Sequence, residues 1–273
     1  MRLFYILLSY FNVIFISFFY SFKKLRKIYP NHSLKHKLTI SLTSKRSRFK
    51  FLHLTLKSII FQTVMPDNLI LWIDKKEKKF LNKNILNLKK YGLKIKYCKN
   101  FRSYNKIIHT LKINSKNYII TFDDDVIYEK TSVEYLVNKS IRNRNKIISN
   151  RIHRIVLNKS GMPTKYNKWN WNYTSLKAHK LNFLTGVYGV LYPPNSFFKD
   201  VTNEKIFLKL SPYADDLWLF WMIRLKKKLV LWSEFGLRNI HLNFDEGLSR
   251  INFKNNQNDK QIINLIKYYG LPK

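Results

Sequence analysis

Three consecutive aspartates, Asp123, Asp124 and Asp125, are the sharpest chemical feature of the sequence. Only 16 of the 273 residues are acidic, and adjacent carboxylates repel one another unless cations or hydrogen-bond donors compensate them. Carboxylate oxygens are ligands that Mg²⁺ and Mn²⁺ prefer, and in an extended segment Asp123 and Asp125 point the same way. This acidic triplet predicts either a divalent-cation site or an exposed acidic turn before a helix that begins near Thr131.

A second acidic pair, Asp215 and Asp216, stands directly before a strongly apolar run. One interpretation is structural: Asp215 is a helix N-cap and Asp216 lies in the first turn, where the helix dipole favours negative charge. The other is chemical, because a carboxylate held beside an aromatic wall can serve as a general base. Similarly, His241 is either a structural histidine or a metal ligand. Four tryptophans are either core residues or a stacking surface for a sugar: Trp169, Trp171, Trp218 and Trp221.

Alternating strand and helix patterns predict how these groups are positioned. Leu38–Thr43 and 93–97 alternate apolar and polar residues, whereas 69–73 and 118–122 are continuous apolar runs typical of strands buried on both faces. Helical spacing of apolar residues occurs at 49–60, 80–88 and 104–111. The order βαβαβαβ indicates an α/β fold with a mostly parallel central sheet flanked by helices. Ligands bind such sheets at the carboxyl ends of the strands, where the acidic triplet stands.

Composition narrows the class of protein. The 51 Lys and Arg residues exceed the 16 Asp and Glu residues and give a net charge of +35, which favours anionic ligands and anionic membranes. Compositional bias is the competing explanation, since alanine occurs only at positions 178 and 214. A single cysteine, Cys98, excludes an internal disulfide and a multi-cysteine zinc site. No glycine-rich phosphate loop is present.

The N-terminus has the composition of a membrane anchor. Residues 3–22 are almost wholly apolar and uncharged, and four basic residues follow within 23–27. A helix of about 20 residues crosses a bilayer core of about 30 Å, and the positive charges place the rest of the chain in the cytoplasm. We therefore expect residues 1–30 to be an anchor helix with a basic stop, either spanning the membrane or lying in its interface. The alternative is a helix packed into the domain.

The second half of the chain is less informative. Residues 167–173 are polar and aromatic without a clear period, which is typical of a loop and fits a lid or an acceptor-binding insert. Residues 252–273 include a short amphipathic helix that either packs on the domain or lies on a membrane.

Taken in order, three motifs resemble the GT-A fold glycosyltransferases of the family 2 type, which act in bacterial capsule and lipopolysaccharide assembly. The first is a βαβ unit with Thr43, Ser44 and Arg48 after its first strand and Asp74 after its second. The second, residues 119–125, matches the Asp-x-Asp motif that follows a buried strand in the family. The third is the acidic pair, which takes the place of a Glu-Asp pair.

The resemblance implies a single GT-A-like catalytic domain over 31–273, with a nucleotide-binding half at 31–150 and an acceptor and catalytic half at 151–273. It assigns donor binding to eight residues: Thr43, Ser44, Arg48, Asp74, Lys106, Asp123, Asp124 and Gly186. It assigns Asp125 and His241 to an Mn²⁺ or Mg²⁺ ion and Asp216 to the catalytic base, with Asp215 as the alternative base because the usual Glu is missing. Lys106 then reaches the donor diphosphate, although a solvated lysine is equally compatible with its sequence context. Gly186 and Gly189 either lie near the sugar or form a turn.

The implied reaction is transfer of a hexose from a nucleotide sugar, foremost a UDP-sugar, with inversion. The implied acceptor is a surface glycan or a lipid-linked glycan at the cytoplasmic face of the inner membrane. Nucleic acid is not an expected partner of such an enzyme. A basic nucleic-acid-binding protein is the first alternative, and it explains the charge of +35 but not the acidic triplet. A metal-dependent phosphodiesterase is the second, although it normally needs more acids and histidines around two metals.

Overall fold

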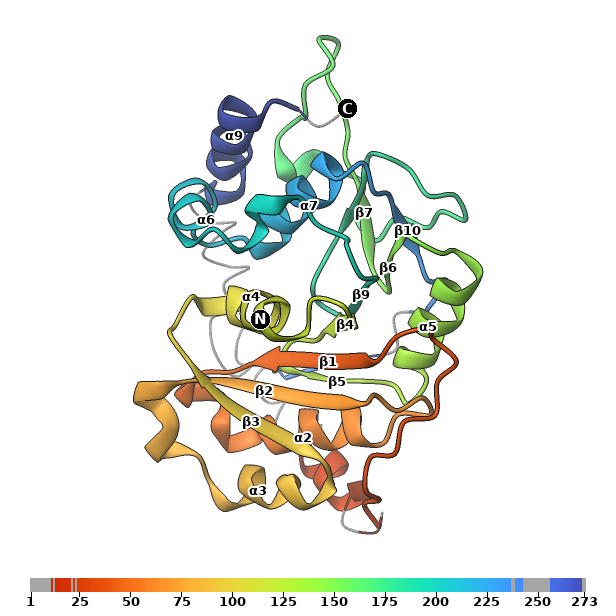
Figure 1. Ribbon diagram of the computed structural model, residues 1–273, viewed down its shortest axis with the longest axis vertical. Helices are drawn as coiled ribbons and strands as arrows, with labels where there is room; N and C mark the ends of the chain where they lie inside the picture. Colours follow the sequence, from red (N-terminus) through yellow and green to blue (C-terminus); the bar gives the residue numbers. More distant parts are fainter. Residues whose placement is uncertain are drawn as a thin grey trace.

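The computed structural model describes residues 11, 13–20, 22, 24–236, 239–242 and 256–271. A seven-stranded sheet forms the centre of this part of the chain, in the order β10-β6-β9-β4-β1-β2-β3 (Figure 1). Its strands are β1 (Leu38–Thr43), β2 (Asn68–Asp74), β3 (Leu93–Cys98), β4 (Tyr118–Thr121), β6 (Ile147–Ser149), β9 (Val190–Tyr192) and β10 (Val230–Trp232).

The sheet is mostly parallel, as the sequence predicts. β1 pairs in parallel with β2 and β4, β2 with β3, and β6 with β10. β9 runs antiparallel between β4 and β6. Two ribbons stand apart from the sheet: β5 (Val126–Ile127) with β11 (Ile240–His241), and β7 (Ile152–Arg154) with β8 (Asn182–Leu184). The predicted α/β fold with a mostly parallel sheet is confirmed.

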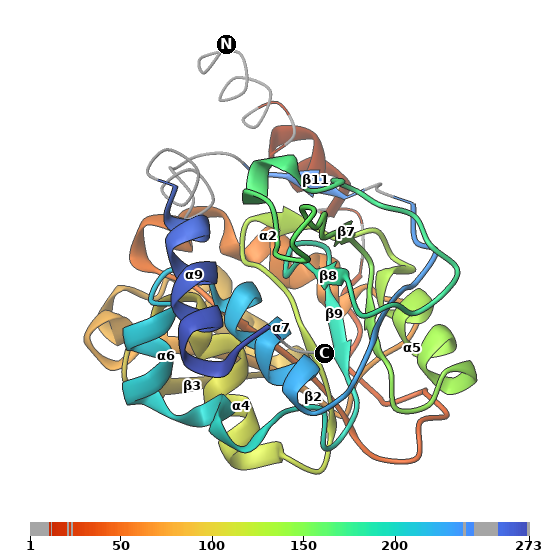
Figure 2. The ribbon, with the colours of Figure 1, turned by 90° about the horizontal axis from the view of Figure 1, so that it is seen from above.

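Helices cover both faces of the sheet (Figures 1 and 2). Their bounds are α2 (Phe49–Ile60), α3 (Lys83–Leu86), α4 (Asn105–Asn114), α5 (Ser132–Arg142), α6 (Glu204–Leu210), α7 (Asp215–Leu225) and α9 (Gln257–Tyr269). Short 3₁₀ turns lie at Arg46–Arg48, Lys75–Phe80, Asn87–Tyr91, Arg102–Tyr104, Tyr166–Lys168 and Lys199–Thr202. Buried side chains of α2, α3 and α5 share one core with the sheet, whereas those of α4, α7 and α9 share the core on the other face.

The alternation of β1 explains this division. Leu38, Ile40 and Leu42 are fully buried in the core shared with α2. Because successive side chains point to opposite faces of a strand, Thr39 and Ser41 point to the face of α4. Their burial at 0% exposure requires hydrogen-bond partners there.

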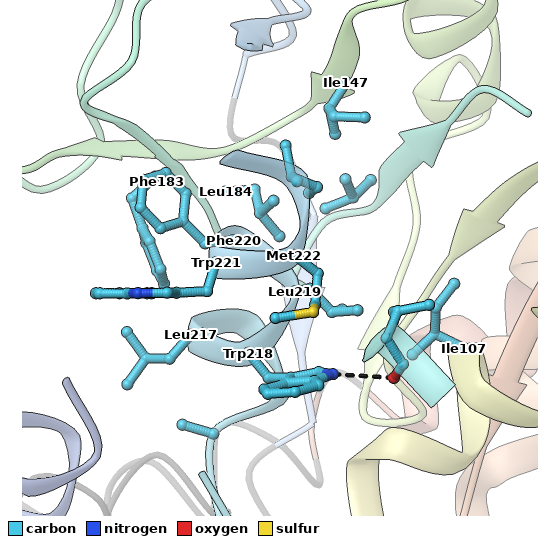
Figure 3. Close-up of a cluster of buried hydrophobic side chains, with 14 of the residues drawn as sticks. Ile107, Ile147, Phe183, Leu184, Leu217, Trp218, Leu219, Phe220, Trp221 and Met222 are labelled. Atoms are coloured by element: carbon cyan, nitrogen blue, oxygen red, sulfur yellow. Dashed lines mark hydrogen bonds between the residues drawn. The ribbon is translucent and has the colours of Figure 1, made fainter. Parts of the chain in front are cut away.

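The core around α7 contains three of the four tryptophans that were candidates for sugar stacking, and Figure 3 labels two of them, Trp218 and Trp221. Trp218 and Trp221 of α7 are at most 1% exposed, and Trp169 is also buried. The indole N–H of Trp218 donates to the carbonyl oxygen of Val201 at 3.0 Å. These three residues are therefore core residues, and Trp171, at 38% exposure, is the remaining candidate.

The predicted helix near residues 80–88 is not continuous. The chain instead forms a 3₁₀ turn, the four-residue α3 and a second 3₁₀ turn. The Asn82 side chain caps α3 by accepting from the N–H of Ile85 at 3.1 Å. Gly92, with φ of 106°, ends the segment in a left-handed conformation that favours glycine. The cap and the stop therefore bound one short helical stretch, of which only the first four residues are α-helical.

The N-terminal segment is described in part. Residues 13–20 are helical, and Val13, Ile16 and Tyr20 are buried against the domain. Positions 1–10, 12, 21 and 23 of the predicted anchor lie outside the described residues. Within the described residues, no helix combines the length and the apolarity that crossing a bilayer requires. The structure thus does not show the predicted 20-residue apolar helix, and the boundaries proposed at residues 30 and 150 stay predictions.

Candidate active site

A cleft of about 500 Å³ opens at the carboxyl ends of the central parallel strands. Thr43 ends β1, Asp74 ends β2 and Asp123 follows β4. The opposite wall includes the start of α7, where the acidic pair stands. This is the strand edge at which parallel α/β sheets bind ligands.

The cleft brings together nearly all of the site residues that the sequence predicts. Its lining includes Thr43, Ser44, Arg48, Asp74, Lys106, Asp123, Asp124, Asp125, Asp215, Asp216 and His241. Gly186 lies directly behind this lining, where its N–H donates to Asp216 Oδ2 at 2.9 Å. Gly189 has a different explanation. A Cβ atom there would lie 2.4 Å from the ring of Phe122, so close packing against that ring requires glycine.

The acidic triplet does not continue β4 as an extended segment. Asp124 and Asp125 lie in a turn, and two cations compensate the three carboxylates. Asp123 Oδ1 accepts from the Lys106 ammonium at 2.6 Å. Arg48 forms ion pairs with Asp124 and with Asp125, the latter at 3.1 Å. The two cations come from the turn after β1 and from α4, so the triplet is compensated by its own half of the chain.

These contacts give Asp123 and Asp125 different pKa values. Burial acts to raise the pKa of Asp123, but the Lys106 ammonium outweighs it and holds the pKa below its usual value. Burial raises the pKa of Asp125 to about 7, and the charges of Asp124 and Asp123 add to this effect despite the opposing charge of Arg48. The triplet thus has more negative charge than its two cations stabilise.

The acidic pair is held by the backbone and by the same lysine. Asp216 Oδ2 accepts the N–H of Gly186, and Asp215 Oδ2 lies 3.2 Å from the Lys106 ammonium. Burial raises the pKa of Asp216 to about 7, and the adjacent charge of Asp215 acts in the same direction. Lys106 and the Gly186 N–H oppose that rise. A carboxyl group with a pKa near neutrality can take up and release a proton at working pH.

Lys106 joins the two acidic clusters. Its side chain is buried, and it lies within ion-pair distance of Asp123 and Asp215. Burial alone would lower the pKa of Lys106, but the charges of Asp123, Asp215 and Asp216 outweigh it and raise the pKa well above its usual value. The lysine therefore remains charged, and the alternative of a solvated surface lysine is wrong.

A chain of buried hydrogen bonds fixes the first turn of α4 and with it Lys106. The Trp72 indole N–H donates to Thr110 Oγ1 at 2.7 Å. The hydroxyls of Thr110 and Ser41 are also 2.7 Å apart, and Ser41 Oγ lies 2.5 Å from the carbonyl oxygen of Lys106. That carbonyl has no hydrogen, so Ser41 donates to it and Thr110 donates to Ser41. The polar face of β1 therefore positions the lysine.

The C-terminal helix positions the acidic pair. Gln261 Oε1 in α9 accepts the backbone N–H groups of Tyr213 at 2.9 Å and Ala214 at 3.2 Å, just before α7 begins. Ile262 and Leu265 of α9 are buried in the same core as α7. The tail therefore packs on the domain, which decides between the two alternatives for this segment. No local sequence pattern around Gln261 indicates this function.

The residues present fit a hard divalent cation. Asp125 lines the cleft, and a nearby positive ion would oppose the burial and the neighbouring carboxylate charges that raise its pKa. His241 also lines the cleft, its Nε2 lies 2.6 Å from the Tyr188 hydroxyl, and burial lowers its pKa so that the neutral, ligating form is favoured. Among the described residues, no three His, Cys, Asp or Glu side chains form a complete cation cage. Mg²⁺ commonly takes one or two carboxylates and completes its shell with water and substrate phosphates.

Sequence reasoning missed part of the opposite wall, which includes Arg151 and His153 beside Trp171. Arg151 Nε donates to Asn172 Oδ1 at 2.6 Å. His153 Nδ1 accepts the Asn172 N–H at 3.1 Å, and burial lowers the pKa of His153 to about 4, so the ring is neutral at pH 7. The ring centroids of His153 and Trp171 are 4.7 Å apart. His153 belongs to the short strand β7 and Arg151 directly precedes it, and neither stands in a recognisable motif.

Comparisons with known proteins support the fold. No protein-family model and no curated protein matches the sequence. Among solved structures, the chain is similar to a mannosyltransferase from Pyrobaculum calidifontis in complex with GDP-Man and Mn²⁺, with a TM-score of 0.51, 10% identity and coverage of 96% of this chain and 71% of that one. It also matches an inositol-1-phosphate CTP transferase from T. maritima (TM-score 0.46, 10% identity, 85% and 97% covered). A third match is 4-diphosphocytidyl-2C-methyl-D-erythritol synthase from Anaerococcus prevotii, with a TM-score of 0.48, 15% identity and coverage of 81% of this chain and 96% of that one. The similarity to the mannosyltransferase, at a TM-score of 0.51, shows that the chain shares the overall α/β fold of that structure.

Proposed function

We propose that this protein is a metal-dependent glycosyltransferase of the GT-A family 2 type. It moves a hexose from a nucleotide sugar, foremost a UDP-sugar, to a surface-glycan or lipid-linked acceptor and inverts the anomeric centre. The observation that supports this proposal is the meeting of the acidic triplet and the acidic pair on one buried lysine in one cleft. If the triplet only bound a metal, or if the pair only capped α7, neither cluster would need the other close by.

The donor nucleotide is proposed to bind at the ends of β1 and β2. Thr43, Ser44 and Asp74 line this part of the cleft. The Ser44 hydroxyl is buried and has no hydrogen-bond partner among the described residues, so it is available to a ligand. Asp74 accepts the N–H of Lys76 at 3.0 Å, which orients its carboxylate for contact with the ribose or base.

The donor diphosphate is proposed to lie beside the acidic triplet. Asp125 and His241 would hold the divalent cation, which supplies charge neutralisation for the leaving diphosphate. Asp123 is already held ionised by Lys106, so it is oriented to accept a hydrogen bond from the ribose. Arg48 lies between Asp124 and Asp125 and contributes a second positive charge at this end of the cleft.

Asp216 is proposed to be the general base. Its carboxylate is oriented by the Gly186 N–H, and its pKa of about 7 allows it to remove the proton of an acceptor hydroxyl at neutral pH. The acceptor oxygen then attacks the anomeric carbon from the face opposite the diphosphate. Asp215 is buried against Lys106 and is the less accessible of the two carboxylates. This difference favours Asp216 over Asp215 as the base.

The wall formed by Arg151, His153 and Trp171 is proposed to receive the acceptor. Trp171 offers an exposed aromatic face, which sugars use for stacking. Arg151 is near enough to Asp216 for the aspartate charge to raise its pKa, although burial lowers that pKa more strongly. The acceptor wall and the base are therefore neighbours.

Calorimetric titration of the full chain with UDP-, GDP- and CDP-sugars, with and without Mn²⁺, tests the proposal. We expect one nucleotide sugar to bind only with the metal, and we expect Asp125→Ala to abolish that binding. Glu204→Ala, which changes a carboxylate that pairs with Lys99 and Lys112 outside the cleft lining, is the control and should retain binding.

Two results would contradict the proposal. If no nucleotide sugar binds while short DNA or RNA binds with a steep salt dependence, the protein is a nucleic-acid-binding protein. If the protein hydrolyses phosphodiesters with Mn²⁺ and Asp125→Ala stops that reaction, it is a phosphodiesterase.

A further inference from the structure

The N-terminal helical segment, residues 13–20, has two apolar faces. Val13, Ile16 and Tyr20 are buried in a cluster with side chains of α2, β5 and Leu242. The Tyr20 ring also stacks on the ring of Phe61, with centroids 5.3 Å apart and an interplanar angle of 8°. One face of the segment is therefore a fixed part of the domain surface.

The other face exposes a row of large apolar side chains, which we call the apolar row: Phe11, Ile14, Phe15, Phe18, Phe19 and Phe22. All but Phe19 are 62–74% exposed. Their spacing of three and four residues places them along one side of a helix. A contiguous exposed apolar patch on a folded domain usually marks an interaction site for a protein or a membrane.

Positive charge surrounds the apolar row. Lys24, Arg26 and Lys27 follow the helix directly and are exposed. The Lys57 ammonium of α2 lies 5.8 Å from the centroid of the Tyr20 ring, so it flanks the same segment. Glu129 is the acidic residue whose charge acts on Tyr20. Among the described residues, these four basic side chains give the surroundings of the row a positive charge.

We propose that the apolar row docks on an anionic lipid bilayer, with the helix lying in the plane of the interface. Exposed Phe side chains beside Lys and Arg are typical of interfacial helices, which insert their apolar face at the headgroup boundary. The buried face argues against a spanning helix, because Val13 and Ile16 would have to leave the core. A second copy of the chain is disfavoured as the occupant, since both copies have a net charge of +35.

Docking in this way brings the cleft near the lipid surface. The N–H of Leu242, which packs against the helix, donates to the carbonyl oxygen of Asp125 at 2.8 Å. Ile127 of β5 also contacts the helix cluster and follows the acidic triplet by two residues. The proposal does not depend on the transferase activity, so vesicle binding and nucleotide-sugar binding can each fail alone.

Co-sedimentation of the full chain with phosphatidylcholine vesicles, with and without phosphatidylglycerol, tests the proposal. We expect binding to the anionic vesicles, and we expect it to weaken but persist between about 0.1 M and about 1 M salt, because salt screens the charges and not the apolar contact. The triple variant Ile14→Ser, Phe15→Ser, Phe22→Ser should bind at least about tenfold more weakly. The matched control, Ile113→Ser, Leu176→Ser, Leu208→Ser, changes exposed apolar residues elsewhere and should bind as the wild type does.

A second variant keeps the test independent of folding defects. The fluorescence of Phe15→Trp should be quenched by brominated lipids more strongly than that of the wild type, because the new indole enters the bilayer. The proposal is wrong if binding to anionic vesicles is absent, or if high salt removes it completely. It is also wrong if both triple variants lose binding equally, or if Phe15→Trp shows no added quenching. Light scattering that shows a dimer disrupted only by the first triple variant would instead assign the row to a second copy.

Discussion

The acidic triplet and the acidic pair share one cleft, but they are stabilised in different ways. The triplet stands in a turn after a buried strand, and the side chains of Arg48 and Lys106 compensate it. The pair stands in the first turn of α7, where the helix dipole and the backbone N–H of Gly186 stabilise negative charge. The Lys106 ammonium contacts both clusters directly, through Asp123 and Asp215.

The comparison shows how surroundings assign different chemistry to the same residue type. Asp123, paired with a buried ammonium, has a lowered pKa and stays ionised. Asp216, buried beside another carboxylate, has a pKa of about 7. A permanently ionised carboxylate is suited to positioning and to binding, whereas one that titrates near neutrality is suited to proton transfer. The predictions below test this division.

The largest effect is expected from Asp216→Asn. The amide keeps the shape and the hydrogen bond from Gly186 but cannot accept the acceptor proton, so kcat should fall by about 10²–10⁴-fold. Calorimetry should show unchanged binding of the nucleotide sugar, because the donor contacts lie in the other cluster. Asp125→Asn, in contrast, should lose the metal-dependent binding of the nucleotide sugar. If Asp216→Asn abolishes donor binding instead, the division between the clusters is wrong.

Lys106→Met should be the most destabilising of these changes. It leaves Asp123 and Asp215 buried without their cation, which should lower the free energy of unfolding by about 3–5 kcal/mol. Urea denaturation measures this change. The control is Lys112→Met. Lys112 lies in α4 like Lys106, but its ion pair with Glu204 is more exposed, so its loss should cost less than about 1 kcal/mol. Equal costs would mean that Lys106 is not the shared counter-charge.

Gly186→Ala tests how closely the backbone approaches the base. An alanine Cβ would lie 2.9 Å from Asp216 Oδ1 and 3.1 Å from the Lys106 ammonium, so one of them must move. We expect a loss of about 1–3 kcal/mol in stability or transition-state binding, read from urea denaturation and from kcat/KM. Gly161→Ala is the control for adding a methyl group where no atom lies within 4 Å, although its φ of 78° adds backbone strain. A loss of kcat in that control would point to a general effect on folding.

The smallest effect is a shift in the pH profile. Asp216 acts as a base only when ionised, so kcat/KM should rise with pH through about 7. Asp215→Asn removes the adjacent negative charge and should move this rise to lower pH by about one unit, while burial keeps the pKa of Asp216 above its usual value. An unchanged profile would assign the titration to a different group.

Local patterns predicted much of the framework. The strands at Leu38–Thr43 and Leu93–Cys98 and the helix at Phe49–Ile60 follow periodicities that depend on nearest neighbours along the chain. The acidic triplet and the acidic pair were also evident from the sequence, because carboxylates are rare in this chain. The helix expected near residues 80–88 is confirmed only in part, since the cap at Asn82 starts α3 at Lys83 and the chain continues as a 3₁₀ turn from Asn87.

Contacts between distant segments were outside the reach of such patterns. Lys106 has the same local sequence whether it is solvated or buried. Only the packing of α4 beside β4, together with the nearby start of α7, places Asp123, Asp215 and Asp216 around it. Local sequence also does not reveal that Gln261 of α9 accepts a backbone N–H just before α7. Nor does it reveal that Arg151 lines the opposite wall of the cleft.

The sequence by itself determined the order of strands and helices up to residue 122, the strong positive charge and the two acidic clusters. The tertiary structure decided which cation meets which carboxylate, and therefore which aspartate stays ionised and which titrates near pH 7. The physical reason is that periodicity depends on neighbours along the chain. A pKa depends on burial and on charges a few ångströms away in space.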